Sequence, residues 1–287
     1  MRRQISSILL MGGLALQLPA EVIRISVSDL LYDTIAASLE ETAQARGDTY
    51  VLKEVGSQPA MVHLEAEQTD LAIIAVSDGG ALPAGDFRVQ PFAFDAAVVV
   101  VNQDNPLNEI TLDQLGSIFG QNESMSLITW GQLNLPGWDN RSIKAMAAQS
   151  ESVALELFKH TVLLGSDLKS GVAQLKQSAV ERIIESDPSV IAILPGLPVS
   201  NKIKPLMISQ DDQKPAFGPS ENNILYGDYP IRLAFYLVYR TRDTAKLEPI
   251  FSTLYSDVVA EELRQNQFFS LPDPVRRQVK IDFEFKK

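Results

Sequence analysis

Four short segments combine hydroxyl or carboxylate side chains with the expected start of a helix. At such a start, free backbone N–H groups and the helix dipole favour an oxyanion, and serine hydroxyls can donate to the same oxygens. Taken singly, each serine or aspartate is better explained by helix capping or by a turn. Their recurrence nevertheless predicts an anion site built from residues 28–31, 56–58, 77–80 and 149–152.

The surrounding pattern places these segments after strands of an α/β protein. Residues 22–28 alternate apolar and polar side chains, and residues 31–46 then switch to helical spacing. The same alternation predicts a parallel sheet that is covered on both faces. Because ligands bind at the carboxyl ends of such strands, Ser28, Ser57, Asp78 and Ser150 are expected to face one cleft. Further strands are predicted at 49–55, 71–76, 96–101, 189–196 and 231–240, and further helices at 111–119, 152–163 and 171–186. Two terminal helices are expected after the strand at 231–240.

The first twenty residues have the pattern of a secretory signal. Arg2 and Arg3 precede an apolar stretch that ends in Leu-Pro-Ala, which predicts cleavage after Ala20 and export to the periplasm. The stretch is short for a membrane span and no similar run follows, so the mature protein is expected to be soluble. The chain contains no cysteine, so neither a lipid anchor nor a disulfide is expected.

The charge of the mature chain excludes several partners. Without Arg2 and Arg3, 23 basic residues stand against 36 acidic ones, a net charge of −13. Such a surface repels nucleic acid and anionic lipid. It does not exclude a small anion, because a buried site depends on dipoles and hydrogen bonds within a few ångströms.

Several motifs resemble the PstS-like family, the phosphate-binding subunits of ABC importers. The segments Ser28-Asp29-Leu30-Leu31 and Gly56-Ser57 resemble two ligand loops of that family, and the segment 70–78 resembles its Asp-Phe-Gly-Ala-Ser-Asp element, with Asp78 as the last aspartate. The run FAFDAAVVVVNQDNPLNEITLDQLGSIFGQ resembles the family's strand, turn and helix. Together with DYPIRLAFYLVY and the closing helices, the resemblance covers nearly the whole mature chain.

The resemblance implies a two-lobed type II periplasmic-binding-protein fold, an α/β architecture in which each lobe is a doubly wound, mainly parallel sheet flanked by helices. Lobe one is expected to comprise residues 21–97 and 231–287, and lobe two residues 98–230, after a signal peptide at 1–20. The lobes would close on a small oxyanion such as phosphate, and the closed form would dock on an ABC permease. A monomer without cofactor or metal is expected.

The resemblance also implies roles for individual residues. Asp78 would accept a hydrogen bond from a protonated ligand oxygen, Ser57 and Ser150 would donate hydroxyls, and backbone N–H groups near Leu31 and Ser152 would complete the cage. The full predicted ligand-binding set is Ser28, Asp29, Leu30, Leu31, Gly56, Ser57, Ser77, Asp78, Ser150, Glu151 and Ser152.

Three departures from the family pattern bear on the ligand. Met146 stands where the family has an arginine, Glu151 replaces a glycine, and Leu30 replaces a threonine. Arginine makes the strong bidentate contacts to a phosphate, and an added carboxylate opposes them. The cleft is therefore expected to prefer a ligand that is protonated, less charged or accompanied by a cation.

Two other classes of function remain open at this point. An enzyme would have to work with only His63 and His160, both expected on helices, and with a Ser150 nucleophile that has no identified base, so catalysis is not expected. A protein that keeps the fold but acts as a sensor or an extracellular interaction partner is the alternative suggested by the altered loop.

Overall fold

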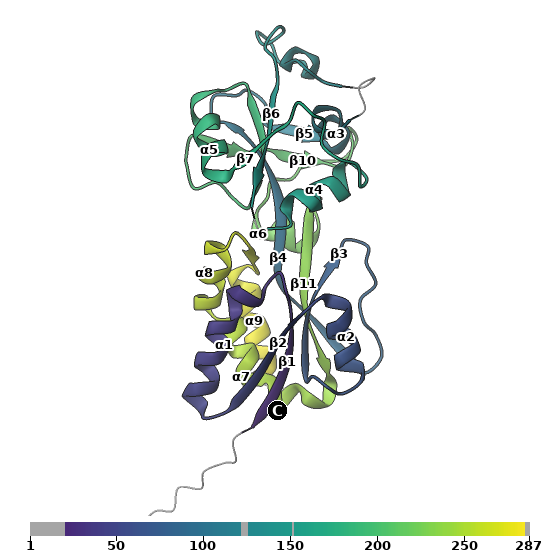
Figure 1. Cartoon of the computed structure of the whole chain (residues 1–287), viewed down its shortest axis with the longest axis vertical. Helices are drawn as coiled ribbons and strands as arrows, with labels where there is room; N and C mark the ends of the chain where they lie inside the picture. The colour runs from purple at the N-terminus through teal and green to yellow at the C-terminus, as the bar shows by residue number, and fades with distance from the viewer. Residues whose placement is uncertain (1–20, 122–125, 151, 285–287) are drawn as a thin grey trace, which may run out of the picture.

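The computed structural model describes residues 21–121, 126–150 and 152–284, which form two groups of elements stacked end to end (Figure 1). The lower group contains β1 (Val22–Ser28), α1 (Tyr32–Arg46), β2 (Thr49–Val55), α2 (Ser57–Glu65), β3 (Leu71–Ser77), β11 (Arg232–Arg240), η3 (Thr241–Asp243), α7 (Thr244–Leu254), α8 (Asp257–Gln265), β12 (Phe269–Ser270) and α9 (Asp273–Glu284). The upper group contains β5 (Glu109–Thr111), α3 (Leu112–Phe119), η2 (Trp130–Leu133), β6 (Lys144–Gln149), α4 (Ala154–Val162), β7 (Ala173–Lys176), α5 (Gln177–Ser186), β8 (Val190–Pro195), β9 (Ile203–Pro205), β10 (Met207–Ser209) and α6 (Glu221–Tyr226). The long strand β4 (Phe87–Asn102) runs from one group into the other.

The main sheet has the strand order β2-β1-β3-β11-β4-β8-β6-β7. Its two ends, β2-β1-β3 and β8-β6-β7, are parallel. The antiparallel pairs all involve β4 or β11, the strands near the centre. Each end therefore has the parallel strands that were predicted, and antiparallel strands join the ends.

Strand β4 belongs to both groups because its two parts have different neighbours. Residues 87–96 pair with β11, whereas residues 97–102 pair with β8 and β9. From Phe92 onward every residue is buried, and the run of four valines suits a strand that is covered on both faces. The hydrogen-bonded sheet is thus continuous through β4, and the division into lobes at residue 97 stays a prediction.

Most predicted elements are confirmed, and the differences have local causes. Residues 171–186 were expected to form one helix, but the segment begins as strand β7 and becomes helical only at Gln177. Strand β7 pairs with β6 at the edge of the sheet, so a neighbouring strand overrides the helical spacing. The strand expected at 231–240 is followed by three helices, α7, α8 and α9, rather than two.

The chain passes between the two groups twice, in β4 and in the segment just before β11, and these two crossings are hydrogen-bonded to each other. The N–H of Ala97 donates to the carbonyl of Ile231 at 3.1 Å. The hydroxyl of Tyr229, a fully buried residue, donates to the carbonyl of Ala97 at 2.8 Å. These bonds fix the path of both crossings at one level of the molecule.

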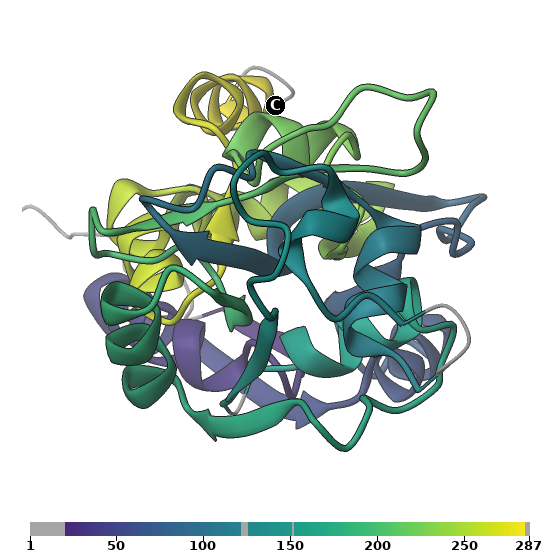
Figure 2. The same cartoon turned by 90° about the horizontal axis from the view of Figure 1, so that it is seen from above.

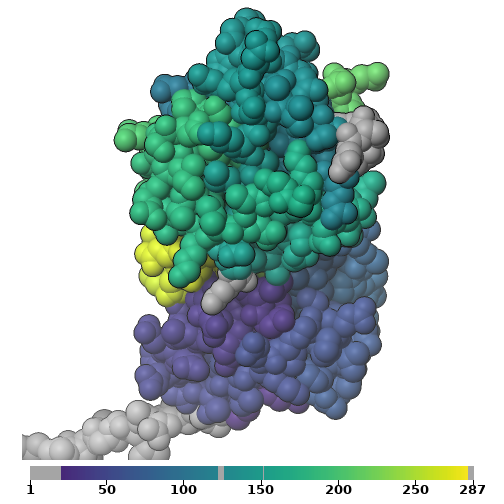
Figure 3. All heavy atoms as spheres, turned by 45° about the horizontal axis from the view of Figure 1, so that its top comes forward, coloured from purple at the N-terminus to yellow at the C-terminus, as the bar shows by residue number. Residues whose placement is uncertain are grey.

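The C-terminal elements reach up to the upper group at one side of the molecule. The side chain of Gln267 donates to that of Gln177 on α5 at 2.6 Å. Gly196, which follows β8 with φ +83°, lies so close to Gln267 that a Cβ there would be 2.9 Å from its carbonyl oxygen. Figure 1 shows α5 above α8 at this side, Figure 2 shows the two helices on the same side when seen from above, and Figure 3 shows yellow C-terminal atoms between the two groups.

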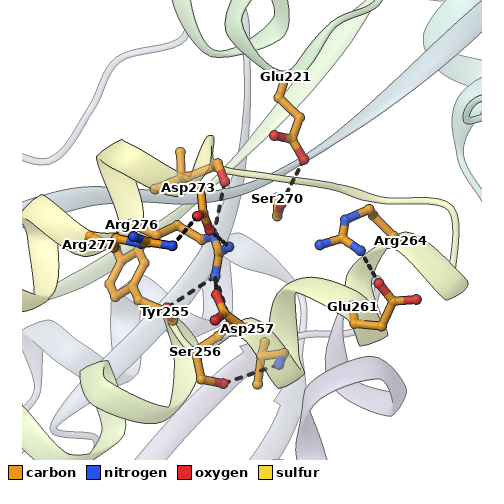
Figure 4. A network of polar contacts seen from close by, with 12 residues as sticks. Glu221, Tyr255, Ser256, Asp257, Glu261, Arg264, Ser270, Asp273, Arg276 and Arg277 are labelled. Atoms are coloured by element: carbon orange, nitrogen blue, oxygen red, sulfur yellow. Dashed lines mark hydrogen bonds and ion pairs between the residues drawn. The ribbon is translucent and has the colours of Figure 1, made fainter.

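A buried arginine secures these C-terminal elements. Arg276 on α9 is 6% exposed and donates to the carbonyl of Ser256 at 3.0 Å and to the carboxylate of Asp257 at 2.9 Å (Figure 4). Ser270 on β12 also donates to Glu221 on α6 at 3.0 Å. Arg276 therefore joins α9 to the start of α8, and Ser270 joins β12 to α6. Among the residues that the structure describes, no helix is long and apolar enough to cross a membrane.

Candidate functional site

A cavity of about 410 Å³ lies where the two groups and β4 meet. This volume is within the range of about 300–1,000 Å³ that is usual for small-molecule sites. The start of α1, the start of α4, β4 and the loop from α8 to β12 all contribute to its wall. The described residues that line it are Asp29, Leu30, Asp33, Thr34, Asp95, Ser150, Ser152, Val153, Gln265, Asn266, Gln267 and Phe268.

The cavity brings together part of the predicted site. Asp29 and Leu30 after β1, and Ser150 and Ser152 before α4, line it as expected for residues that follow strands. Glu151 lies outside the described residues. The remaining predicted residues do not line this cavity, namely Ser28, Leu31, Gly56, Ser57, Ser77 and Asp78.

The turn between β1 and α1 uses its own polar groups internally. Ser28 and Leu31 are both buried, and the N–H of Leu31 donates to the carbonyl of Ser28 at 2.9 Å. The N–H of Asp29 donates to the carbonyl of Val55 at 3.2 Å. These two amides are therefore engaged within the protein, and Asp29 and Leu30 are the residues of this turn that line the cavity.

The segment at Gly56 and Ser57 has a structural contact of its own. Gly56 is the N-cap of α2, and the hydroxyl oxygen of Ser57 accepts the N–H of Ala75 at 2.8 Å. This bond ties the first residue of α2 to β3. The hydroxyl of Ser57 is thus engaged in a bond that joins α2 to β3 rather than in a helix cap.

Asp78 forms an ion pair with an arginine. Its carboxylate receives Arg232 at 2.8 Å and 3.2 Å, and the guanidinium lies 5.5 Å from the ring of Phe94. Arg232 is the first residue of β11, whereas Ser77 at the end of β3 pairs with the next residue, Leu233. The charge of Asp78 is therefore balanced by a neighbouring side chain.

Asp95 is the most unusual group in the cavity wall. It lies in β4, is only 1% exposed, and receives the hydroxyl of Ser152 on Oδ2 at 3.0 Å. Its other oxygen, Oδ1, has no hydrogen-bond partner among the described residues. Burial raises the pKa of Asp95 to about 6, against the opposite effect of the Ser152 hydrogen bond and nearby backbone N–H groups.

The hydroxyl group of Ser152 makes hydrogen bonds both to Asp95 and to the first turn of α4. While its hydroxyl donates to Asp95, its oxygen accepts the N–H of Ala154 at 3.0 Å, the first residue of α4. The hydroxyl of Ser152 is thus engaged by a protein carboxylate, whereas the predicted role of backbone N–H groups near Ser152 stays a prediction. The hydroxyls of Ser150 and Thr34 line the same cavity.

The described wall of the cavity carries three carboxylates and no lysine, arginine or histidine. Asp33 stands in the first turn of α1, where its negative charge already complements the helix dipole. Met146, at the position where an arginine was sought, is half-buried in β6 and packs against the hydrophobic core. The cavity is therefore electrostatically unfavourable for a dianion.

The histidines and tryptophans lie elsewhere. His63 contacts Ser26 at 3.3 Å and Lys53 at 3.4 Å, in the lower group. Trp130 is fully buried, packs edge-on against Trp138 and donates to the carbonyl of Ser189, so it anchors its loop. No cluster of three or more potential metal-ligating side chains occurs within the described ranges.

A larger groove, of about 890 Å³, lies entirely within the upper group. It runs between β5, the end of η2 and the residues 207–216. None of the predicted site residues lines it, and its wall contains no segment of the lower group. The cavity at the junction is therefore the better candidate for the site.

A family model described as a PBP superfamily domain matches residues 17–253 of this chain. The curated relatives include the phosphate-binding protein PstS of Pseudomonas aeruginosa, which is 25% identical over 171 residues, covering 56% of this chain and 51% of PstS. Protein SphX of Synechococcus elongatus is 26% identical over 189 residues, covering 63% of this chain and 55% of SphX. The chain thus spans about half the length of the curated relatives that it matches.

Solved structures share the fold of this chain. PstS from Borrelia burgdorferi superposes with a TM-score of 0.67 at 15% identity, covering 88% of this chain and 99% of that one. A possible phosphate binding protein from Planctomyces limnophilus gives a TM-score of 0.64 at 15% identity, covering 92% and 98%. The predicted fold class and the predicted resemblance are confirmed.

Proposed function

This chain belongs to the PBP superfamily, and from that premise we propose that it is a solute-binding protein of the phosphate ABC-importer type that holds a small oxyanion between two lobes. The observation that carries the proposal is the cavity at the junction, whose wall includes Asp29 and Leu30 after β1, Asp95 in β4, and Ser150 and Ser152 before α4. One curated relative is named a phosphate-binding protein, which supports a binding function rather than catalysis.

The proposed lobes are residues 21–97 with 231–287, and residues 98–230. The chain crosses between them in β4 and again just before β11, and the hydrogen bonds of Ala97 with Ile231 and Tyr229 mark the level of the crossings. A small rotation there would change the separation of the walls of the cavity. Binding would then be an equilibrium between open and closed forms.

The remaining features of this function are also proposals. The protein would be exported, with its signal peptide cleaved near Ala20, and would act as a monomer that delivers its ligand to an ABC permease. The acidic cavity favours one second candidate, a binding protein that acts as a sensor or an extracellular interaction partner instead of in phosphate import. The two candidates share the site and differ in what the closed form contacts.

Calorimetric titration of phosphate tests the proposed function. Because the described wall carries three carboxylates and no cation, we expect weak phosphate binding to the wild type. A Met146→Arg/Glu151→Gly variant should bind at least tenfold more tightly, since both changes make the net charge around the end of β6 more positive. Met146→Leu serves as the matched apolar control and should bind like the wild type. If neither phosphate, sulfate, phosphonates nor small carboxylates bind to any of these proteins, the proposed function is wrong.

A further inference from the structure

The residues that line the cavity carry many hydrogen-bond acceptors and no cationic side chain. Besides Asp29, Asp33 and Asp95, the wall contains the side-chain amides of Gln265, Asn266 and Gln267. One N–H of each amide donates within the protein, to Glu261 at 3.2 Å, to the carbonyl of Glu262 at 2.9 Å and to Gln177 at 2.6 Å, respectively. Within the described residues, their carbonyl oxygens receive no donor.

Asp95 gives an independent indication of a missing donor. A buried carboxylate oxygen without a partner is costly, because neither water nor protein replaces the hydration that it has lost. Oδ1 of Asp95 is such an oxygen, in a side chain that is 1% exposed and lines the cavity. A ligand that donates a charge-assisted hydrogen bond from the cavity would satisfy it.

We propose that the ligand is a small zwitterion, an oxyanion joined by a short spacer to a protonated amine, with the ammonium group held by Asp95 and the amide carbonyls. This inference rests on the proposed function, which supplies the oxyanion. An ammonium group carries three donors and a positive charge, which match an acceptor-rich and negatively charged wall. The hydroxyls of Thr34 and Ser150 lie in the same wall and can donate to the oxyanion.

The size of the cavity agrees with such a ligand. At about 410 Å³ it is in the range for small organic molecules, so it has room for an oxyanion, a spacer and an amine together. A metal ion is a poorer occupant, because the described residues contain no group of three or more side chains placed to ligate one. An organic ammonium needs only hydrogen-bond acceptors, and these are present.

Calorimetry with matched ligands tests the inference. The probes are 2-aminoethylphosphonate, its uncharged-chain counterpart n-propylphosphonate, phosphate and n-propylamine. We expect 2-aminoethylphosphonate to bind the wild type at least tenfold more tightly than each of the other three. In Asp95→Asn the preference for the amine should fall to threefold or less, because the carboxylate that pairs with the ammonium is gone.

Two further variants keep the test decisive. Asp33→Asn removes an exposed carboxylate of the same wall and should reduce the preference partially. Asp167→Asn removes the same formal charge at an exposed position of the upper group and should leave the preference intact. Equal binding of n-propylphosphonate, or of n-propylamine, overturns the inference. Binding of oxyanions without a preference for the amine refutes this inference alone. If no oxyanion binds at all, the proposed function is refuted as well.

Discussion

As the pH rises from 4 to 7 without ligand, the Asp95→Asn variant should gain about 2 kcal/mol of unfolding free energy relative to the wild type. The reason is that burial raises the pKa of Asp95 from 3.8 to about 6. A carboxyl group with a raised pKa binds its proton more tightly in the folded state. Its contribution to stability is complete below pH 3.8 and is lost as the pH rises through about 6. Asparagine has the same shape and no such dependence.

Urea unfolding of both proteins at several pH values measures this difference. Asp33→Asn is the matched control, because Asp33 lines the same cavity but is exposed. It removes one charge from the same wall without removing a buried one, so its difference from the wild type should change little over this pH range. A flat difference for Asp95→Asn as well would show that Asp95 is solvated in the free protein.

Replacement of Tyr229 by alanine is expected to lower the free energy of unfolding by about 3–5 kcal/mol, as for other buried aromatic residues. Tyr229 is fully buried at the level of the two crossings, and its hydroxyl donates to the carbonyl of Ala97. Burial also raises the pKa of Tyr229, so the phenol stays neutral and able to donate. Tyr229→Phe keeps the ring and should cost only about 1 kcal/mol, the value of one hydrogen bond.

Thermal and urea unfolding of these variants separate packing from hydrogen bonding. Tyr226→Ala is the matched control, because Tyr226 is 71% exposed on the neighbouring helix α6. A surface substitution of this kind should change stability by no more than about 0.5 kcal/mol. Similar losses for Tyr229→Ala and Tyr226→Ala would contradict the packing of Tyr229 between the crossings.

The periodicity of the sequence predicted most of the fold because each pattern reflects local burial. Strands β1 and β2 begin and end where the alternation of residues 22–28 and 49–55 begins and ends. Strand β4 was predicted only at residues 96–101, the apolar run, whereas it begins at Phe87. Residues 87–91 are partly exposed and become strand through pairing with β11, a contact more than 140 residues away in the sequence.

The candidate site was harder to predict, because its wall comes from distant parts of the chain. Asp95 had a visible signal, since it is the one charged residue in the run FAFDAAVVVV, but its burial depends on Ser152 and the upper group. The loop of Gln265–Phe268 had no signal, because only the packing of α8 and α9 brings it to the cavity. Asp78 is a different case, since its pairing with Arg232 depends on the register of β11 against β3.

We propose that the two lobes close on a ligand in the cavity at their junction. The absence of cysteine from the chain allows spin labels to be placed without interference. Labels on Ala37→Cys in α1 and Ser186→Cys in α5 report the distance between lobes on the side shown in Figure 2, and labels on Ala37→Cys and Val62→Cys in α2 report a distance within lobe one. With saturating 2-aminoethylphosphonate or phosphate, we expect the first distance to shorten and the second to stay the same. An unchanged first distance, in a sample whose ligand binding has been verified by calorimetry, would contradict the account.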